Sequence, residues 1–226
     1  MQQDLFLQSS ADEPVLADSP NEQARLIAIS DEALLLKSAL TPVASRILAQ
    51  IETVAVSNPF RQRYTPGGHQ MSVAMTCCGE VGWVTDQQGY RYSAVEPESG
   101  RRWLPIPSEW LQWVQPLAAR AGFEGFTPDS CLINRYAPGA GMGLHQDRDE
   151  RDLSAPIVSF SLGAPAVFRW GGLTRQEPVT EFLLEHGDVL IWGGADRLRF
   201  HGVKKMKRYH HPQTEGYRYN LTFRQS

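Results

Sequence analysis

The sequence contains few cysteines and no long apolar run, and these absences exclude several classes of protein. Its three cysteines are an odd number without C-x-x-C spacing, which argues against a disulfide framework and a structural zinc site. No stretch of about 18 consecutive apolar residues occurs, and the first residues lack the basic and apolar regions of an export signal. We therefore expect a soluble, cytoplasmic protein without a membrane partner. Nothing in the sequence indicates an obligate protein partner, so we expect a monomer.

An excess of acidic residues is confined to the start of the chain. The net charge is −3, but residues 1–32 hold seven acids and one base, which leaves 18 acids against 21 bases in the remainder. This basic body contains a dense run that could neutralise nucleic-acid phosphates. The alternative is that these basic residues belong to a solvated surface loop. When the run is considered without other motifs, we favour this alternative. The run consists of Arg197, Arg199, Lys204, Lys205, Lys207 and Arg208.

Two segments have helical periodicity. Thr41 and Pro42 predict the N-cap and first turn of a helix that ends at Asn58. A second helix is predicted from Ser108 to about Gly122. Both helices have one apolar face and are expected to support the fold.

Short apolar or alternating runs, separated by glycine turns, dominate the chain from Cys131 onward. No helix-length segment separates them, so an antiparallel jelly roll is expected in place of a parallel β/α arrangement. We predict a mainly β fold with flanking helices. The predicted strands are 131–136, 157–162, 166–170, 182–184, 189–192, 198–203 and 217–223.

The composition also predicts how the chain is divided. Residues 1–20 are rich in Gln, Ser, Asp and Pro and are interpreted as a disordered tail. Residues 21–226 are expected to form a single domain. Within it, residues 60–103 are interpreted as an accessory hairpin layer and residues 130–226 as the jelly-roll core.

Three residues have the types and spacing of a metal site. His145 and Asp147 are two residues apart, so on an extended strand their side chains project from the same face. This pair alone is weak evidence. His201, at the end of an apolar run, supplies a second imidazole and completes a 2-His-1-carboxylate set, which leaves coordination positions of iron(II) open for a cosubstrate and oxygen.

The last predicted strand has one polar and one apolar side. Its polar side carries Arg218, Asn220, Thr222 and Arg224. Two guanidinium groups on one side suit a dicarboxylate such as 2-oxoglutarate, because each binds a carboxylate through paired charged hydrogen bonds. Without the histidines, a solvent-facing strand would be the preferred interpretation. Asn134 and Tyr136 share one side of their strand and could add hydrogen bonds to the same ligand.

Together these motifs resemble the signature of the AlkB-type 2-oxoglutarate-dependent dioxygenases, over roughly residues 58–226. The motifs are N-R-Y-x-P-G at 134–139, H-x-D at 145–147, His201 and R-x-N-x-T-x-R at 218–224. The resemblance implies a double-stranded β-helix with iron(II), 2-oxoglutarate and O2 as cofactor and cosubstrates. It implies that iron is bound by His145, Asp147 and His201. It implies that 2-oxoglutarate is held by Asn134, Tyr136, Arg218, Asn220 and Arg224, with Arg218 at its distal carboxylate.

We expect the substrate-binding surface in the accessory layer. The resemblance therefore implies that this layer recognises a nucleotide. Trp83, Tyr90 and Tyr92 offer faces on which an extruded base could stack, and Met75 offers an apolar wall. Without the resemblance, these aromatic residues would be interpreted as ordinary core or turn residues. The resemblance adds three polar residues to the expected substrate site: Arg91, Asp149 and Arg175.

The function implied is oxidative dealkylation of N-alkylated bases of the 1-methyladenine and 3-methylcytosine type, releasing formaldehyde, succinate and CO2. The expected partner is alkylated DNA, preferably single-stranded, with RNA as a further candidate. One alternative keeps the dioxygenase chemistry but acts on a small molecule or a protein side chain. A second alternative, ranked lower, is a non-catalytic metal-binding jelly roll, for which the paired arginines would have no use.

Overall fold

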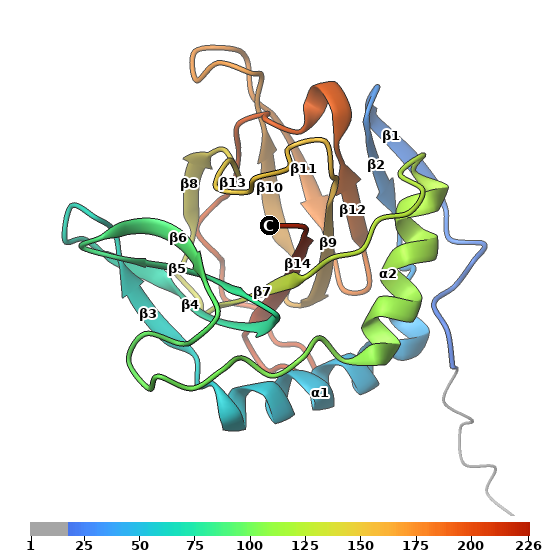
Figure 1. Cartoon of the computed structure of the whole chain (residues 1–226). Coiled ribbons are helices and arrows are strands. Elements are labelled where there is room, and N and C mark those ends of the chain that lie inside the picture. Colours follow the sequence, from blue (N-terminus) through green and yellow to red (C-terminus); the bar gives the residue numbers. More distant parts are fainter. Residues whose placement is uncertain (1–17) are drawn as a thin grey trace, which may run out of the picture.

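Two antiparallel sheets form most of the structure, a computed structural model that describes residues 18–226 (Figure 1). The larger sheet has the strand order β1-β2-β12-β9-β14-β7-β4-β3, and the smaller has the order β11-β10-β13-β8. This arrangement confirms the prediction of a mainly β jelly roll with flanking helices. The tail predicted at residues 1–20 lies, up to residue 17, outside the described residues. The strands of the two sheets are β1 (Leu26–Ser30), β2 (Ala33–Leu36), β3 (Arg61–Tyr64), β4 (Gln70–Gly79), β7 (Ser130–Tyr136), β8 (Met142–His145), β9 (Ile157–Gly163), β10 (Ala166–Trp170), β11 (Thr180–Leu184), β12 (Val189–Trp192), β13 (His201–Val203) and β14 (Arg218–Arg224).

The last strand, β14, lies in the middle of the larger sheet, between β7 and β9. Arg218 pairs with Tyr136 of β7, and Asn220 pairs with Asn134. Because alternate residues of a strand share a face and paired residues lie side by side, all four side chains project toward the space between the sheets. This polar side of β14 is buried, with Arg218 only 1% and Arg224 6% exposed. The alternative of a solvent-facing strand is therefore wrong.

Most of the predicted strands occupy the expected residues, but the run 198–203 is extended only in β13. Before β13, a 3-10 turn, η2 (Gly194–Asp196), leads into a further turn in which the Arg199 amide donates to the Asp196 carbonyl. Three strands were not predicted. β8 was missed because it is short and contains Gly143, with Gly141 directly before it. β1 and β2 form a short hairpin that joins the larger sheet where β2 pairs with β12.

Both predicted helices are present, and the first begins differently from the prediction. Residues Thr41–Val43 form a 3-10 turn, η1, and only then does α1 (Ala44–Ser57) begin. The N-cap position of this turn is occupied by Leu40 and not by Thr41, and no side chain makes a capping hydrogen bond there. The second helix, α2 (Ser108–Arg120), accommodates Pro116 on its exposed side.

The predicted accessory layer, residues 60–103, is only partly separate from the core. β3 and β4 extend the larger sheet, because β4 pairs with β7 over six residues, from Ala74 opposite Arg135 to Gly79 opposite Ser130. Only β5 (Gly82–Asp86) and β6 (Gly89–Ser93) stand apart, as a two-stranded hairpin. The sheet core therefore includes β1 to β4 as well as residues 130–226.

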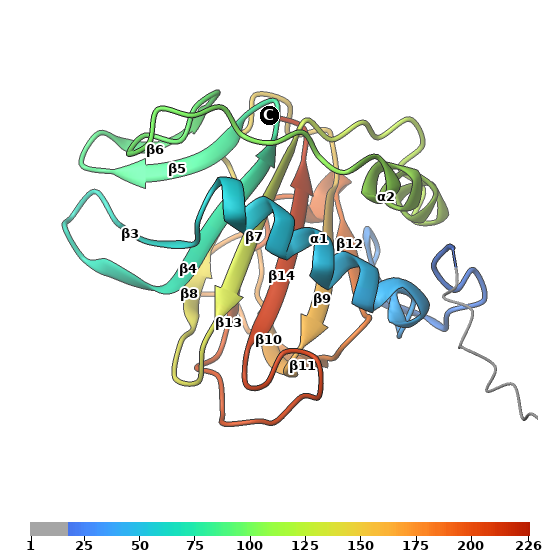
Figure 2. The ribbon, with the colours of Figure 1, turned by 90° about the horizontal axis from the view of Figure 1, so that it is seen from below.

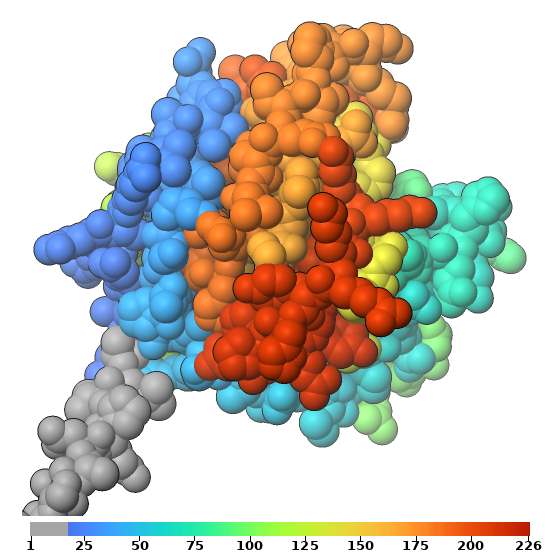
Figure 3. Space-filling model, turned by 180° about the vertical axis from the view of Figure 1, so that it is seen from behind, coloured from blue at the N-terminus to red at the C-terminus, as the bar shows by residue number. Residues whose placement is uncertain are grey.

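Apolar side chains fill two regions of the molecule. One cluster lies between the larger sheet and the helices, and α1 crosses the outer face of that sheet (Figure 2). The other lies between the two sheets and includes Phe168, Trp170 and Trp192. On the opposite side from the view of Figure 1, the segment that follows β13 spreads over the lower part of the molecule (Figure 3). Neither α1 nor α2 has the length and apolar character needed to cross a membrane.

Candidate active site

A cavity of about 740 Å³ opens between the two sheets and the β5–β6 hairpin. Its walls come from strands of both sheets, from the hairpin and from the loop that follows β8. The cavity is therefore a single space in which residues distant in sequence can act on one ligand. Among the residues expected to be functional, it is lined by Met75, Trp83, Tyr90, Asn134, Tyr136, His145, Asp147, Asp149, Arg175, His201, Asn220 and Arg224.

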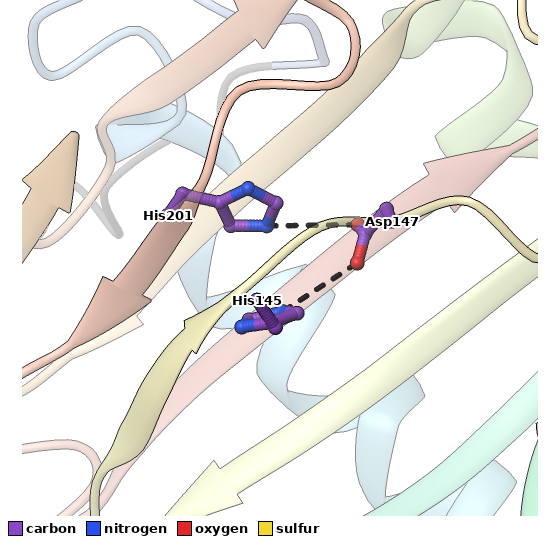
Figure 4. A group of neighbouring side chains, drawn as sticks. All are labelled: His145, Asp147 and His201. Atoms are coloured by element: carbon purple, nitrogen blue, oxygen red, sulfur yellow. Dashed lines mark ion pairs between the residues drawn. The ribbon is translucent and has the colours of Figure 1, made fainter. Parts of the chain in front are cut away.

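The two histidines and the aspartate meet at one end of this cavity (Figure 4). His145 ends β8, and His201 opens the neighbouring strand β13 directly opposite it. The carboxylate of Asp147 lies 3.5 Å from Nε2 of His145 and 3.8 Å from Nε2 of His201. One potential ligand atom from each residue lies within 4.8 Å of the others. Among residues 18–226, this is the group with the composition and spacing of a metal site.

Main-chain carbonyls fix the orientation of both imidazole rings. Nδ1 of His145 lies 2.9 Å from the carbonyl oxygen of Gly143, and Nδ1 of His201 lies 3.0 Å from that of Arg199. A carbonyl can only accept a hydrogen bond, so each Nδ1 carries the proton. Each Nε2 is then left with a lone pair that faces Asp147, as metal ligation requires.

The ionisation states of Asp147 and His201 also suit a cation, whereas at His145 burial alone would lower the pKa but Asp147 outweighs it and raises that pKa. Burial alone would raise the pKa of Asp147, but Arg224 and the two histidines outweigh it and hold that pKa well below its usual range. Burial, with a smaller contribution from His145, lowers the pKa of His201 to about 4. An ionised carboxylate and a neutral imidazole are the forms that bind metal.

A buried cation lies at the other end of β14. The Arg218 side chain donates from Nη2 to the Ser161 hydroxyl at 2.9 Å, whereas its Nε and Nη1 have no partner within residues 18–226. Burial lowers the pKa of Arg218 to about 10. Oδ1 of Asn134 is also buried without a donor among the described residues. Buried polar groups without hydrogen-bond partners cost free energy of folding, and a ligand carboxylate would accept hydrogen bonds from the free guanidinium donors. The residues present therefore fit 2-oxoglutarate.

Arg218 itself does not line the cavity, although Tyr136, its neighbour on β7, does. Asn220 lines it as well, and its amide is held by the Ser159 hydroxyl at 2.7 Å and by the Thr222 hydroxyl at 3.1 Å. Asn220 thus donates a hydrogen bond to β9 and accepts one from the next polar residue of its own strand, and both bonds order the polar side of β14.

An aromatic pair forms the wall on the hairpin side. The rings of Trp83 and Tyr90 are stacked with centroids 5.6 Å apart and planes inclined by 19°. Nε1 of Trp83 donates to Oδ2 of Asp149 at 2.8 Å. Met75 is buried beside them, and Arg175 lies on the rim with its guanidinium 4.9 Å from the centre of the Phe200 ring. This wall of the cavity therefore combines flat apolar faces with the carboxylate of Asp149.

Arg91 and Tyr92 were expected at this surface, but neither lines the cavity. Arg91 forms an ion pair with Asp86 of its own hairpin, at 2.7 Å. Tyr92 directs its hydroxyl to Glu150 at 2.5 Å. The sequence prediction missed Glu150, although it directly follows the predicted substrate residue Asp149.

The basic run is also less available than its sequence indicated. Arg197 is 2% exposed and bonded to Glu150, Arg199 pairs with Asp196, and Lys204 pairs with Glu181. The other three members of the run are exposed on the segment after β13: Lys205, Lys207 and Arg208.

Comparisons with known proteins agree with this geometry. The family model described as the 2OG-Fe(II) oxygenase superfamily matches residues 32–224. The chain is 52% identical over 194 residues to the alpha-ketoglutarate-dependent dioxygenase AlkB of Escherichia coli (strain K12), covering 86% of this chain and 90% of that protein. It is 36% identical over 135 residues to the nucleic acid dioxygenase ALKBH1 of Homo sapiens, covering 59% of this chain and 34% of that protein. The solved structure of OsALKBH1 matches with a TM-score of 0.78 and 30% sequence identity, covering 89% of this chain and 100% of that one.

A 2-His-1-carboxylate group and a buried arginine with unused donors are what iron(II) and 2-oxoglutarate require. The match to the family model extends over both, from residue 32 to Arg224. The chain therefore belongs to the 2OG-Fe(II) oxygenase superfamily and, within it, to the AlkB-type alpha-ketoglutarate-dependent dioxygenases.

Proposed function

We propose that this dioxygenase removes alkyl groups from N-alkylated bases of the 1-methyladenine and 3-methylcytosine type, as a direct-reversal repair of DNA. The observation that carries the proposal is the stacked Trp83–Tyr90 pair, with Asp149 bonded to Trp83, in the same cavity as the histidine–aspartate group. A relative of this chain bears the name nucleic acid dioxygenase, which supports the same substrate class.

The metal would be held by His145, Asp147 and His201. Iron(II), with 2-oxoglutarate and dioxygen, supplies the oxidant that hydroxylates the alkyl carbon and yields succinate and CO2. The hydroxymethyl group that results on the cationic base then leaves as formaldehyde: its hydroxyl proton is released, and the electron pair of the broken C–N bond returns to the ring nitrogen, which restores the neutral base. The protein's part is to hold the alkyl group close to the metal and to keep water away.

The cosubstrate would lie along the polar side of β14. The free donors of Arg218 suit its distal carboxylate, and Arg224 lies at the metal end, 2.6 Å from Asp147. These two cations fix the direction in which a dicarboxylate lies. Three further residues would complete the contacts: Asn134, Tyr136 and Asn220.

The base would lie against Trp83 and Tyr90, with Met75 as the wall beneath. A base alkylated at these ring nitrogens is cationic, so an aromatic face attracts it by about 0.5–2 kcal/mol more than a neutral base. Asp149 would accept a hydrogen bond from the exocyclic amine, and Arg175 on the rim could contact the adjacent backbone.

A base must leave its stack to enter this cavity, which costs least in a single strand. We therefore favour single-stranded DNA, with RNA as a further substrate. We also propose that residues 21–226 act as one domain and as a monomer, with the base held by residues 60–103. A reducing compartment such as the cytoplasm would suit the three buried cysteines, which form no disulfide.

The test supplies the purified protein with iron(II), 2-oxoglutarate and oligonucleotides that carry one 3-methylcytosine, in single- and double-stranded form. We expect formaldehyde and succinate in equal amounts, formed faster with the single strand. Succinate without formaldehyde from any methylated oligonucleotide, DNA or RNA, would contradict the proposal and favour a small molecule or a protein side chain as substrate.

A further inference from the structure

Glu150 is a carboxylate buried beside the candidate metal centre, with a side chain only 2% exposed. It lies three residues after Asp147, and it does not line the cavity. A carboxylate removed from water is costly unless cations and hydrogen-bond donors surround it. The groups around Glu150 therefore indicate its role.

Three elements of the fold meet at this carboxylate. Its Oε1 accepts a hydrogen bond from the Tyr92 hydroxyl at 2.5 Å and lies 3.4 Å from Nε of Arg224. Its Oε2 accepts a hydrogen bond from Nη2 of Arg197 at 3.0 Å. Glu150 thus joins the β5–β6 hairpin, the end of β14 and the segment between η2 and β13.

Both arginines that contact Glu150 also hold Asp147. Nη2 of Arg224 donates to Oδ2 of Asp147 at 2.6 Å. Nη1 of Arg197 donates to the main-chain oxygen of Asp147 at 2.6 Å, while its Nε donates to the carbonyl of Ala155 at 3.0 Å. One arginine therefore orients the carboxylate of Asp147 and the other fixes its backbone.

We infer that Glu150 is a positioning residue that ties the hairpin carrying Trp83 and Tyr90 to the orientation of Asp147, through Arg197 and Arg224. This inference rests on the proposed function, because the hairpin is the surface on which the base would stack. Tyr92 lies two residues from Tyr90 on the same strand, so a base that displaces the hairpin also displaces the Tyr92 hydroxyl and its partner Glu150.

Charge explains why a carboxylate is needed at this position. Glu150 is paired with Arg197 and shares Arg224 with Asp147, so without it Asp147 alone would face both buried guanidinium charges and would be drawn toward them. Glu150 balances one of these charges, which leaves the Asp147 carboxylate available to the metal. A residue that only anchored the hairpin would have no effect on the metal.

The test compares Glu150→Gln and Tyr92→Phe with two exposed control variants, Glu181→Gln and Tyr209→Phe. Binding of manganese(II) to the metal-free protein is measured by calorimetry, and the ratio of succinate to formaldehyde is measured with methylated oligonucleotide. Glu150→Gln should bind manganese(II) about 10- to 100-fold more weakly, as for other groups that orient a metal ligand. Tyr92→Phe should retain metal affinity, because Glu150 keeps both arginines, but should form succinate in excess of formaldehyde. The controls should match the wild type in both measurements.

Wild-type manganese(II) affinity in a folded Glu150→Gln variant would overturn the inference. If that variant does not fold, Tyr92→Phe decides, and a succinate-to-formaldehyde ratio equal to that of the wild type overturns the inference. If the proposed function is wrong, the wild type itself would release no formaldehyde from the methylated oligonucleotide. The manganese(II) measurement would still test the role of Glu150 in that case.

Discussion

The guanidinium of Arg224 donates to Oδ2 of Asp147 at 2.6 Å, on the same carboxylate that faces Nε2 of both histidines. The charge of Arg224 holds the pKa of Asp147 low, against the burial that would raise it. A carboxylate that is already ionised binds a divalent cation without first releasing a proton. Arg224 therefore prepares Asp147 for the metal, in addition to lying where the cosubstrate would bind.

Replacing Asp147 with Ala is expected to abolish turnover, because it removes a metal ligand and leaves Arg224 without its nearest anion. Metal binding, measured by calorimetry, should be lost along with formaldehyde release. Asp152→Ala is the control, since within residues 18–226 this exposed carboxylate bonds only to Ser154. Full activity in Asp147→Ala would remove the residue from the metal site.

Replacing Arg218 with Met should weaken 2-oxoglutarate binding, because a charged hydrogen-bonding group contributes about 1.5–3 kcal/mol. KM for 2-oxoglutarate should rise, with little change in metal affinity. Without cosubstrate the variant should be at least as stable as the wild type, since the buried Arg218 has two donors without a partner among the described residues.

Thermal unfolding with and without 2-oxoglutarate distinguishes this role from a structural one. The cosubstrate should raise the Tm of the wild type and of Arg169→Met, a variant at a partly exposed position, but not that of Arg218→Met. An equal rise in all three proteins would show that Arg218 does not hold the ligand.

Sequence alone identified the candidate metal and cosubstrate residues because their geometry is largely local. His145 and Asp147 are two residues apart, and Arg218 to Arg224 alternate along one strand, so spacing determines which side chains share a side. His201 was chosen for its place at the end of an apolar run, and spacing alone could not show its position opposite His145, which depends on how β8 and β13 meet.

Trp83→Ala should lower formaldehyde release while leaving 2-oxoglutarate and metal binding unchanged. Loss of one stacking face costs about 1–3 kcal/mol of base binding. Trp83→Phe keeps a smaller aromatic face, so its formaldehyde release should lie between that of Trp83→Ala and that of the wild type. Tyr64→Ala, at a side chain that is half exposed and outside the hairpin, is the control. Equal KM values for methylated oligonucleotide in Trp83→Ala and the wild type would contradict base stacking at this residue.

Helix α1 offers a matched pair of positions that tests its packing. Ile47 is fully buried against the larger sheet, whereas Val56 is 84% exposed. Ile47→Ala should lower the free energy of unfolding by about 2–5 kcal/mol. Val56→Ala should change it by no more than about 0.5 kcal/mol. Urea unfolding measures both, and similar values would contradict the burial of this face.

The residues that sequence missed are those whose roles depend on distant contacts. Glu150 meets Arg197 across 47 residues and Tyr92 across 58 residues, so no local pattern relates them. Arg197 was counted in a basic run because sequence records its charge and not its burial. β8 was missed because Gly143 within it and Gly141 directly before it remove the alternating pattern by which strands are recognised.

The most direct measurement is a mass spectrum of a single-stranded oligonucleotide carrying one 1-methyladenine or 3-methylcytosine, after incubation with the protein, iron(II), 2-oxoglutarate and oxygen. We predict that the oligonucleotide loses the mass of one CH2 group and that Asp147→Ala leaves it unchanged. An oligonucleotide that keeps its methyl group while the wild-type protein converts 2-oxoglutarate to succinate would contradict the proposed dealkylation.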